Sequence, residues 1–377
     1  MREQLRVALD ATPLLGRPTG IGIFCAGLLG GLAARSDLEV SAFAVSWRRR
    51  SAIVDRVPEG ISLAQRAMPA RPLHLLWGHA RVPALEWFVG RKDVVHGTNY
   101  VVPPTRRAAR VMSVHDLTTV RFPELCDRAT LVYPHLVRRA LADGAWVHTH
   151  CEYIAAEVVE HFGADPAKVR AIAPGVPPLP PADLETAARH LPRGTSRFVL
   201  AVGTHEPRKD LPSLVRAFDS VAARHDDLAL VLAGPQGWGS GDLATVLADA
   251  KARERIVLTG WVDDATLAGL LQQADVLAYP SVYEGFGFPP LQAMTLGTPV
   301  VSTCVGAVQE VLGDAAMLVA PRDARALAEA LDAVLASKSL AASLSARGRA
   351  RAASYRWDRC AEGFADLYRD AHAEATS

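Results

Sequence analysis

The sequence predicts an α/β protein made of two doubly wound, parallel-sheet domains, and three observations lead to that prediction. The chain has 377 residues, enough for two domains at roughly 100–200 residues each. Short apolar segments alternate with amphipathic helical segments in both halves, an order typical of parallel sheets. A proline-rich stretch at 174–181 interrupts this order near the middle, because neither a helix nor a central strand can continue through it.

The first half predicts a Rossmann-like domain over residues 1–175. Its six strand-like segments are residues 5–10, 40–45, 93–96, 110–115, 145–148 and 169–172. The first segment is followed by a loop containing Gly20 and Gly22, and then by a helical segment at 24–33.

The second half predicts another such domain over residues 196–356, with 176–195 as the linker. Its strand-like segments are residues 197–202, 228–233, 256–259, 276–279, 299–302 and 316–319. The segment 211–224 between the first two has apolar residues at helical spacing. A last helical segment, 357–372, carries apolar side chains on one face.

The composition excludes several classes of protein. Hydrophobic residues make up 50% and charged residues 21%, which is typical of globular chains. The net charge of +1 gives no overall field that would attract nucleic acid. No segment approaches the ~18 consecutive apolar residues of a membrane-spanning helix. The five cysteines are widely spaced, so we expect buried free thiols and a cytoplasmic protein.

The most informative segment is the loop that follows the strand-like residues 276–279. It carries Glu284 between a predicted strand and a short helix that stops before Gly297. Ligands of doubly wound sheets bind beyond the carboxyl ends of the strands. A carboxylate accepts hydrogen bonds from hydroxyls, while loop amides and a helix N-terminus bind phosphate. The loop therefore predicts a site for a polyhydroxylated, negatively charged ligand.

Residues 284–294 are EGFGFPPLQAM, and residues 297–303 are GTPVVST. These segments resemble the E-x7-E region of family 4 of the retaining, nucleotide-sugar-dependent glycosyltransferases, and other segments look mannosyltransferase-like. The resemblance implies the GT-B fold, in which two Rossmann-like domains face a central cleft and a C-terminal helix, here 357–377, crosses back to the N-terminal domain. It implies a hexosyltransferase that needs no metal. In one departure, Gln292 occupies the family's second acidic position.

The resemblance also implies roles for residues of the second half. Arg208 and Lys209, in GTHEPRKD at 203–210, would hold the leaving phosphate, where two cations stabilise developing negative charge. Glu284 would contact the transferred sugar and Gln292 the ribose. An amide there weakens ribose binding by ~1–2 kcal/mol. The further donor-binding residues that the resemblance implies are Gly20, Gly22, Gly203, Val262, Gly285, Phe286 and Gly287.

Residues of the first half would serve the acceptor side. His115 and Asp116, in the segment VHDL, end one predicted strand, and Asn99 follows another. By resemblance, His115 is a catalytic residue near the transferred sugar, while Asn99 and Asp116 meet the acceptor, a hydroxyl-bearing glycan or glycolipid. A buried structural histidine is the ordinary alternative for His115.

Several alternatives stay open at this level. GDP-mannose is the first choice of donor, and a UDP- or dTDP-linked hexose remains possible. A non-catalytic nucleotide-sugar-binding protein, prompted by Gln292, and a sugar-nucleotide epimerase or phosphorylase on the same architecture are the rival functions. No metal or other cofactor is expected. The basic residues 47–50 and the aromatic run 73–88 allow weak peripheral contact with the inner membrane face, although a surface turn and a packing helix explain them as well.

Overall fold

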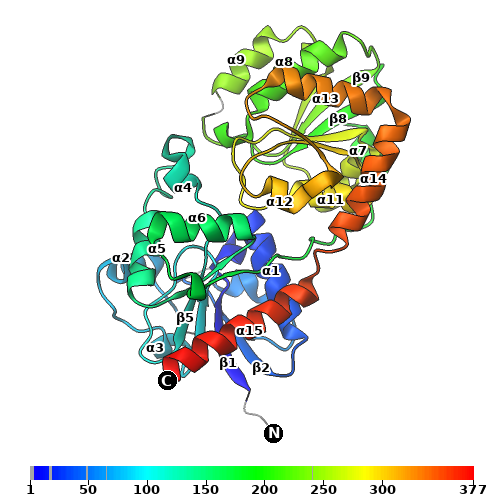
Figure 1. Cartoon of the computed structure of the whole chain (residues 1–377). Helices are drawn as coiled ribbons and strands as arrows, with labels where there is room; N and C mark the ends of the chain where they lie inside the picture. Colours follow the sequence, from blue (N-terminus) through cyan, green and yellow to red (C-terminus); the bar gives the residue numbers. More distant parts are fainter. Residues whose placement is uncertain (1–3, 17–18, 48–49, 65, 240) are drawn as a thin grey trace. The chain divides into compact units, whose positions relative to one another are not determined.

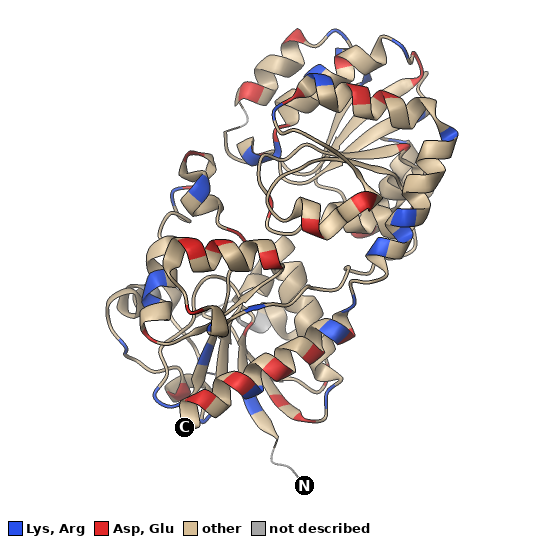
Figure 2. Ribbon diagram, viewed as in Figure 1, with Lys and Arg blue, Asp and Glu red and all other residues tan. Residues whose placement is uncertain are grey.

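The computed structural model describes residues 4–16, 19–47, 50–64, 66–239 and 241–377. The chain divides into two units, Met1–Gly175 with Tyr355–Ser377 and Val176–Ser354 (Figure 1). Each unit contains one parallel sheet with helices packed on it. Acidic and basic residues are interspersed along both units (Figure 2).

The first unit has a seven-stranded sheet in the order β3-β2-β1-β4-β5-β6-β7. Its strands are β1 (Leu5–Asp10), β2 (Leu38–Phe43), β3 (Ser62–Leu63), β4 (Val94–Gly97), β5 (Ala109–Ser113), β6 (Trp146–Thr149) and β7 (Val169–Ala171). Six of them coincide with the predicted segments within a few residues. The two-residue β3 is too short to give a sequence pattern, and it was not predicted.

Six of the described helices of this unit lie between its strands in sequence, and α15 is the last helix of the chain. They are α1 (Gly20–Ala33), α2 (Ala70–His79), α3 (Glu86–Val89), α4 (Thr118–Arg121), α5 (Tyr133–Ala142), α6 (Glu152–Phe162) and α15 (Trp357–Thr376). The run 73–88, expected as one packing helix, is split between α2 and α3. Arg48 and Arg49 of the basic segment lie outside the described residues.

The second unit has a six-stranded sheet in the order β10-β9-β8-β11-β12-β13. Its strands are β8 (Arg197–Val202), β9 (Leu228–Ala233), β10 (Ile256–Gly260), β11 (Val276–Tyr279), β12 (Val300–Thr303) and β13 (Met317–Val319). Its helices are α7 (Leu184–Ala188), α8 (Leu211–Ala222), α9 (Gly241–Asp249), α10 (Asp264–Gln273), α11 (Phe288–Leu296), α12 (Val308–Leu312), α13 (Ala324–Ala336) and α14 (Lys338–Ala352). Buried apolar side chains of α8 and α13 form the core against β8 and β9.

The segment expected as a linker contains a helix. α7 packs against α10, where a Cβ on Gly269 would lie 2.8 Å from the Ala187 Cβ. Residues 184–188 therefore belong to the second unit, because their apolar side chains find a packing surface there. Within the described residues, no helix has both the length and the apolar character needed to cross a membrane.

Helix α15 packs on α1 and on the sheet of the first unit. The hydroxyl of Tyr368 lies 2.8 Å from His96 Nδ1, and both side chains are buried. Glycines on α1 permit the close approach of the two helices. A Cβ on Gly31 would lie 2.8 Å from the backbone oxygen of Trp357, whereas a Cβ on Gly30 would meet nothing within 4 Å.

This packing predicts opposite behaviour for two adjacent alanine substitutions. Gly30→Ala and Gly31→Ala gain the same helix propensity, about 1 kcal/mol. Only Gly31→Ala forces the backbones of α1 and α15 apart. Overpacking of this kind lowers the free energy of unfolding by about 1–3 kcal/mol. Urea unfolding of the first unit should therefore give Gly31→Ala a free energy of unfolding lower than that of Gly30→Ala by this amount. Equal stabilities would show that α15 does not pack closely on α1.

Candidate active site

The charged residues predicted in the second unit meet where the strand order of its sheet reverses. β8 and β11 are neighbours in the sheet although they are far apart in sequence. The loop after β8 carries Arg208 and Lys209, and the loop after β11 carries Glu284. A hydrogen bond of 2.8 Å from the Val282 N–H to the Arg208 carbonyl joins the two loops. Such reversal points are where ligands of doubly wound sheets bind.

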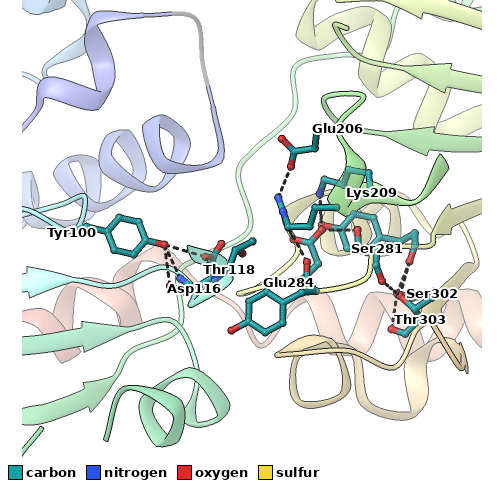
Figure 3. Close-up of polar contacts among 12 residues, drawn as sticks. Tyr100, Asp116, Thr118, Glu206, Lys209, Ser281, Glu284, Ser302 and Thr303 are labelled. Carbon is teal, nitrogen blue, oxygen red and sulfur yellow. Dashed lines mark hydrogen bonds and ion pairs between the residues drawn. The ribbon is translucent and has the colours of Figure 1, made fainter. Parts of the chain in front are cut away.

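Glu284 lies at the centre of a cluster of charges (Figure 3). Its Oε2 is 2.8 Å from an Arg208 guanidinium nitrogen, and its Oε1 is 2.6 Å from Lys209 Nζ. The Ser281 hydroxyl also donates to Oε1, at 2.6 Å. Arg208 forms a second ion pair with Glu206, at 2.9 Å. The structure thus brings three of the predicted catalytic residues together.

The charge state of Glu284 follows from these contacts. Burial by itself raises the pKa of the carboxyl, but the charges of Arg208 and Lys209, with hydrogen bonds from Lys209 and Ser281, lower it to about 2. For Lys209, burial lowers the pKa and the Glu284 charge opposes that effect. The site therefore holds an ionised glutamate between two cations.

Lys209 keeps one donor for a ligand. Its ammonium has three N–H groups. One donates to Glu284, and another donates to the Tyr279 hydroxyl at 3.1 Å. The same nitrogen lies 4.7 Å from the centroid of the Tyr279 ring. Within the described residues the third N–H has no acceptor, so it can bind an anionic oxygen.

The strand β12 and the loop that follows it hold the backbone of the Glu284 loop in place. The Ala307 N–H donates to the Glu284 carbonyl at 2.9 Å. Gly306 has a φ of +51°, and a Cβ there would lie 2.3 Å from the same carbonyl. Thr303 on β12 donates its hydroxyl to the Ser281 carbonyl (Figure 3).

Sequence reasoning did not identify four residues of this cluster, Glu206, Tyr279, Ser281 and Gly306. Gly306 could have been found, because it follows a predicted strand next to β11. Ser281 and Tyr279 act through side-chain contacts with Glu284 and Lys209, and one-dimensional spacing contains no signal for such contacts.

Gly203, a predicted donor-binding residue, lies beside the Lys209 side chain, and its conformation requires glycine. Its φ is +144°, and a Cβ there would contact the Lys209 side chain. Gly234, which ends the neighbouring strand, has a φ of +148°, and a Cβ there would lie 2.0 Å from the Gly203 oxygen. These two strand ends therefore come closer together than residues with side chains would allow.

The remaining predicted donor residues of this loop surround the start of α11. Gly285, Phe286 and Gly287 are buried, and Gly287, with a φ of +112°, is the N-cap of α11. Gln292 is only 6% exposed. Because Pro289 and Pro290 carry no N–H, the first turn offers fewer amide donors than an ordinary helix N-terminus. An anion bound at this site would therefore be held chiefly by side-chain cations.

Val262 is half-buried in the loop after β10, and nothing in its surroundings assigns it a base contact. A carboxylate also caps the helix that follows this loop. Asp263 is the N-cap of α10, since its carboxylate accepts from the Thr266 N–H at 2.8 Å. In the part of the chain that the structure describes, no group of three or more His, Cys, Asp or Glu side chains could hold a metal ion.

Gly20 and Gly22 belong to the first unit and lie in the first turn of α1, not in the preceding loop as expected. Thr19 is the N-cap of this helix, and its hydroxyl accepts from the Gly22 N–H at 3.2 Å. A Cβ on Gly22 would lie 3.1 Å from the Pro13 oxygen. The helix begins four residues earlier than its apolar pattern indicates, because Thr19 provides a cap that the pattern does not contain.

His115 is buried, and both of its ring nitrogens have protein partners. Nε2 donates to the Thr98 carbonyl at 2.7 Å, and Nδ1 lies 2.7 Å from His150 Nε2. Burial lowers the pKa of His115 to about 4, against the opposing effects of the Thr98 hydrogen bond and Asp116. The imidazole is therefore neutral at pH 7, with Nδ1 as the acceptor.

Asp116 is fixed by Tyr100 and by its own loop (Figure 3). The Asp116 N–H donates to the Tyr100 hydroxyl at 3.0 Å, and Asp116 Oδ1 accepts from the Thr118 N–H at 2.9 Å. Asn99, the other predicted acceptor-side residue, has a buried Oδ1 with no hydrogen-bond partner among the described residues. Both residues are half-buried and present polar oxygens.

The ion pairs of Glu284 predict a specific dependence of stability on pH. A carboxyl whose pKa is lowered on folding stabilises the protein fully above its unfolded value near 4.5, and this contribution is lost as the pH falls towards 2. Glu284→Gln should therefore lower the free energy of unfolding at pH 7 by on the order of 3 kcal/mol.

Urea unfolding of the second unit between pH 7 and pH 3 measures this difference. The gap between the wild type and Glu284→Gln should narrow below about pH 4.5. Glu254→Gln removes an exposed glutamate of the same unit and is the matched control. A gap that stays constant down to pH 3 would contradict the ion-pair assignment.

Comparison with known proteins finds a family match in each half of the chain. Residues 18–178 match the family described as Glycosyltransferase Family 4, and residues 184–351 match Glycosyl transferases group 1. The O-antigen chain mannosyltransferase B of Escherichia coli is 28% identical over 286 residues, which are 74% of this chain and 74% of that protein.

Solved structures agree on the architecture. The sucrose-phosphate synthase of Thermosynechococcus elongatus has a TM-score of 0.77 at 21% identity, covering 99% of this chain and 100% of its own. Anabaena HepE, solved with UDP and glucose, has a TM-score of 0.69 at 14% identity, covering 97% of this chain and 100% of its own. The two family matches and the two parallel-sheet units together make this chain a glycosyltransferase with the GT-B fold.

Proposed function

We propose that this glycosyltransferase transfers a hexose from a nucleoside diphosphate sugar to a hydroxyl acceptor with retention of configuration and without a metal ion. The observation that carries the proposal is the buried cluster of Glu284 with Arg208 and Lys209 at the reversal point of the second sheet. It places two cations, suited to a diphosphate, beside a carboxylate suited to sugar hydroxyls.

The residues of the cluster divide the work of the reaction. Arg208 and Lys209 bind the diphosphate, and their charge stabilises its oxygens most when the bond from the sugar C1 breaks. Glu284 accepts hydrogen bonds from sugar hydroxyls and fixes the orientation of the ring. The acceptor oxygen attacks C1 on the face that the diphosphate leaves, and its proton passes to the departing β-phosphate oxygen.

Donor binding must rearrange the cluster. Without a ligand, Glu284 is the anion that neutralises the two cations. A diphosphate brings its own negative charge and shares these cations with Glu284. The third N–H of Lys209 gives the diphosphate a contact that breaks no existing hydrogen bond.

His115 takes a positioning role in this proposal. A neutral imidazole with both nitrogens engaged takes up a proton only by releasing a partner. Its hydrogen bond to the Thr98 carbonyl instead orients the backbone that leads to Asn99. We assign Asn99 and Asp116 to the acceptor side.

Mannose is the sugar that we propose first, with GDP-mannose as the donor. The mannosyltransferase relative supports the sugar, whereas the Anabaena structure with UDP and glucose keeps a UDP-linked hexose as the second candidate. Gln292 presents one acceptor and one donor to the ribose, where a carboxylate would present acceptors only. We expect weaker ribose binding from it and not a dead site.

Substitution of Arg208 tests the proposal. Arg208→Ala removes one stabilising cation from the transition state and should lower kcat at least roughly a hundredfold. Arg208→Lys keeps a charge beside Glu284 but loses the forked geometry, so its kcat should lie in between. Arg216→Ala, an exposed arginine on α8, is the matched control and should keep normal turnover.

The assay follows release of nucleoside diphosphate with and without an acceptor alcohol, and near-UV circular dichroism verifies that each variant is folded. Near-normal turnover in folded Arg208→Ala would contradict the assignment of Arg208 to the active site. Release that no acceptor alcohol stimulates would favour an epimerase or a phosphorylase, and the absence of any release would favour a non-catalytic binding protein.

A further inference from the structure

The first unit contains a cavity of about 720 Å3 that the proposed donor site does not use. β1 and β4 are the two strands at which the order of this sheet reverses, and the cavity lies at their carboxyl ends. Asp10 ends β1, Asn99 follows β4, and both line the cavity. Its volume is in the range of pockets for small organic ligands, about 300–1,000 Å3.

Two hydrogen-bond acceptors in this cavity lack donors. Asp10 is 8% exposed, and its Oδ1 accepts from the N–H and the hydroxyl of Thr12. Its Oδ2 has no partner among the described residues, and burial raises the pKa of Asp10 to about 6. The Asn99 Oδ1 is also without a partner there. An acceptor without a protein donor at the wall of a cavity can accept a hydrogen bond from a ligand hydroxyl.

Most of the remaining wall is apolar, and part of it continues to the surface. Leu75 and Trp77 on α2 and Val132 before α5 contribute to it. Leu75 is 67% exposed and Val132 is 46% exposed. The complex is stabilised when a hydrocarbon chain removes apolar area of this kind from water. A purely polar acceptor would leave it in water.

The charged lining residues narrow the choice of ligand further. Arg110 and Asp143 pair with each other at 3.2 Å, so their charges are already compensated. Arg139 is half-buried and has no ion pair among the described residues. Since the Asp10 carboxylate also lines the cavity, its charge offsets that of Arg139, and the cavity suits a neutral head group.

We propose that this cavity is the acceptor site and that the acceptor is an amphiphile. Its hydroxyl-bearing head lies at Asp10 and Asn99, and its hydrocarbon chain lies against Leu75, Trp77 and Val132. The role as acceptor rests on the proposed function, whereas binding of an amphiphile in the cavity requires only the first unit.

Calorimetric titration of the full chain, without donor, tests the binding. The probes are octyl glucoside, kept below its critical micelle concentration, and methyl glucoside, which has the same head. The octyl compound should bind at least tenfold more tightly, and equal affinities would overturn the proposal. Leu75→Asp should weaken octyl glucoside binding at least fivefold.

Leu76→Asp is the matched control, because Leu76 is the next residue of α2, is 45% exposed and does not line the cavity. It should leave octyl glucoside binding unchanged. An equal loss in both variants would place the octyl chain on the general apolar surface and overturn the cavity assignment.

The acceptor role is tested separately from donor chemistry. Hydrolysis of the donor by water should be the same in Leu75→Asp and the wild type, because this variant leaves the second unit intact. Octyl glucoside should stimulate or competitively inhibit sugar transfer, and binding without either effect would overturn its assignment to the acceptor site. Cavity binding in a protein that cannot hydrolyse any donor would refute the proposed function alone.

Discussion

The arrangement of the second unit depends on one physical constraint, the need to keep the buried charge of Glu284 compensated. A buried carboxylate is tolerated only with opposite charge and hydrogen-bond donors around it. Arg208, Lys209 and Ser281 provide these. Since these residues come from two loops, the same contacts that stabilise Glu284 also hold the loops together. The cluster thus joins the two loops and, in the proposed function, binds the diphosphate of the donor.

The same topological logic operates twice in this chain. Each sheet reverses its strand order once near its centre, and each reversal leaves a space at the carboxyl ends of two adjacent strands. In the second unit this space holds paired charges. In the first it holds a cavity with Asp10 and Asn99 among apolar walls. The chemistry of each space therefore reflects its lining, since the fold of the two units is alike.

The sequence was sufficient to predict most of the fold and part of the site. Local apolar periodicity predicted twelve strands and the helices α8 and α15, and the structure contains all of them. β3 and α7 were not predicted, because a two-residue strand and a one-turn helix depend on neighbours that only the folded chain provides. Arg208, Lys209 and Glu284 could be placed together because parallel strands direct their following loops to one edge of the sheet. The places of Glu206 and Tyr279 in the cluster could not be predicted, because they depend on contacts that exist only in the folded chain. The same is true of the pairing of His115 with His150.

The central claim is that the cations held by Glu284 bind the diphosphate of the donor. The most direct measurement is calorimetric titration with UDP, GDP, ADP and dTDP in the presence of EDTA, each compared with its nucleoside monophosphate. If these cations bind the diphosphate, one nucleoside diphosphate of the four should bind the wild-type protein at least tenfold more tightly than its monophosphate. Equal affinities for the two, with any base, would contradict it.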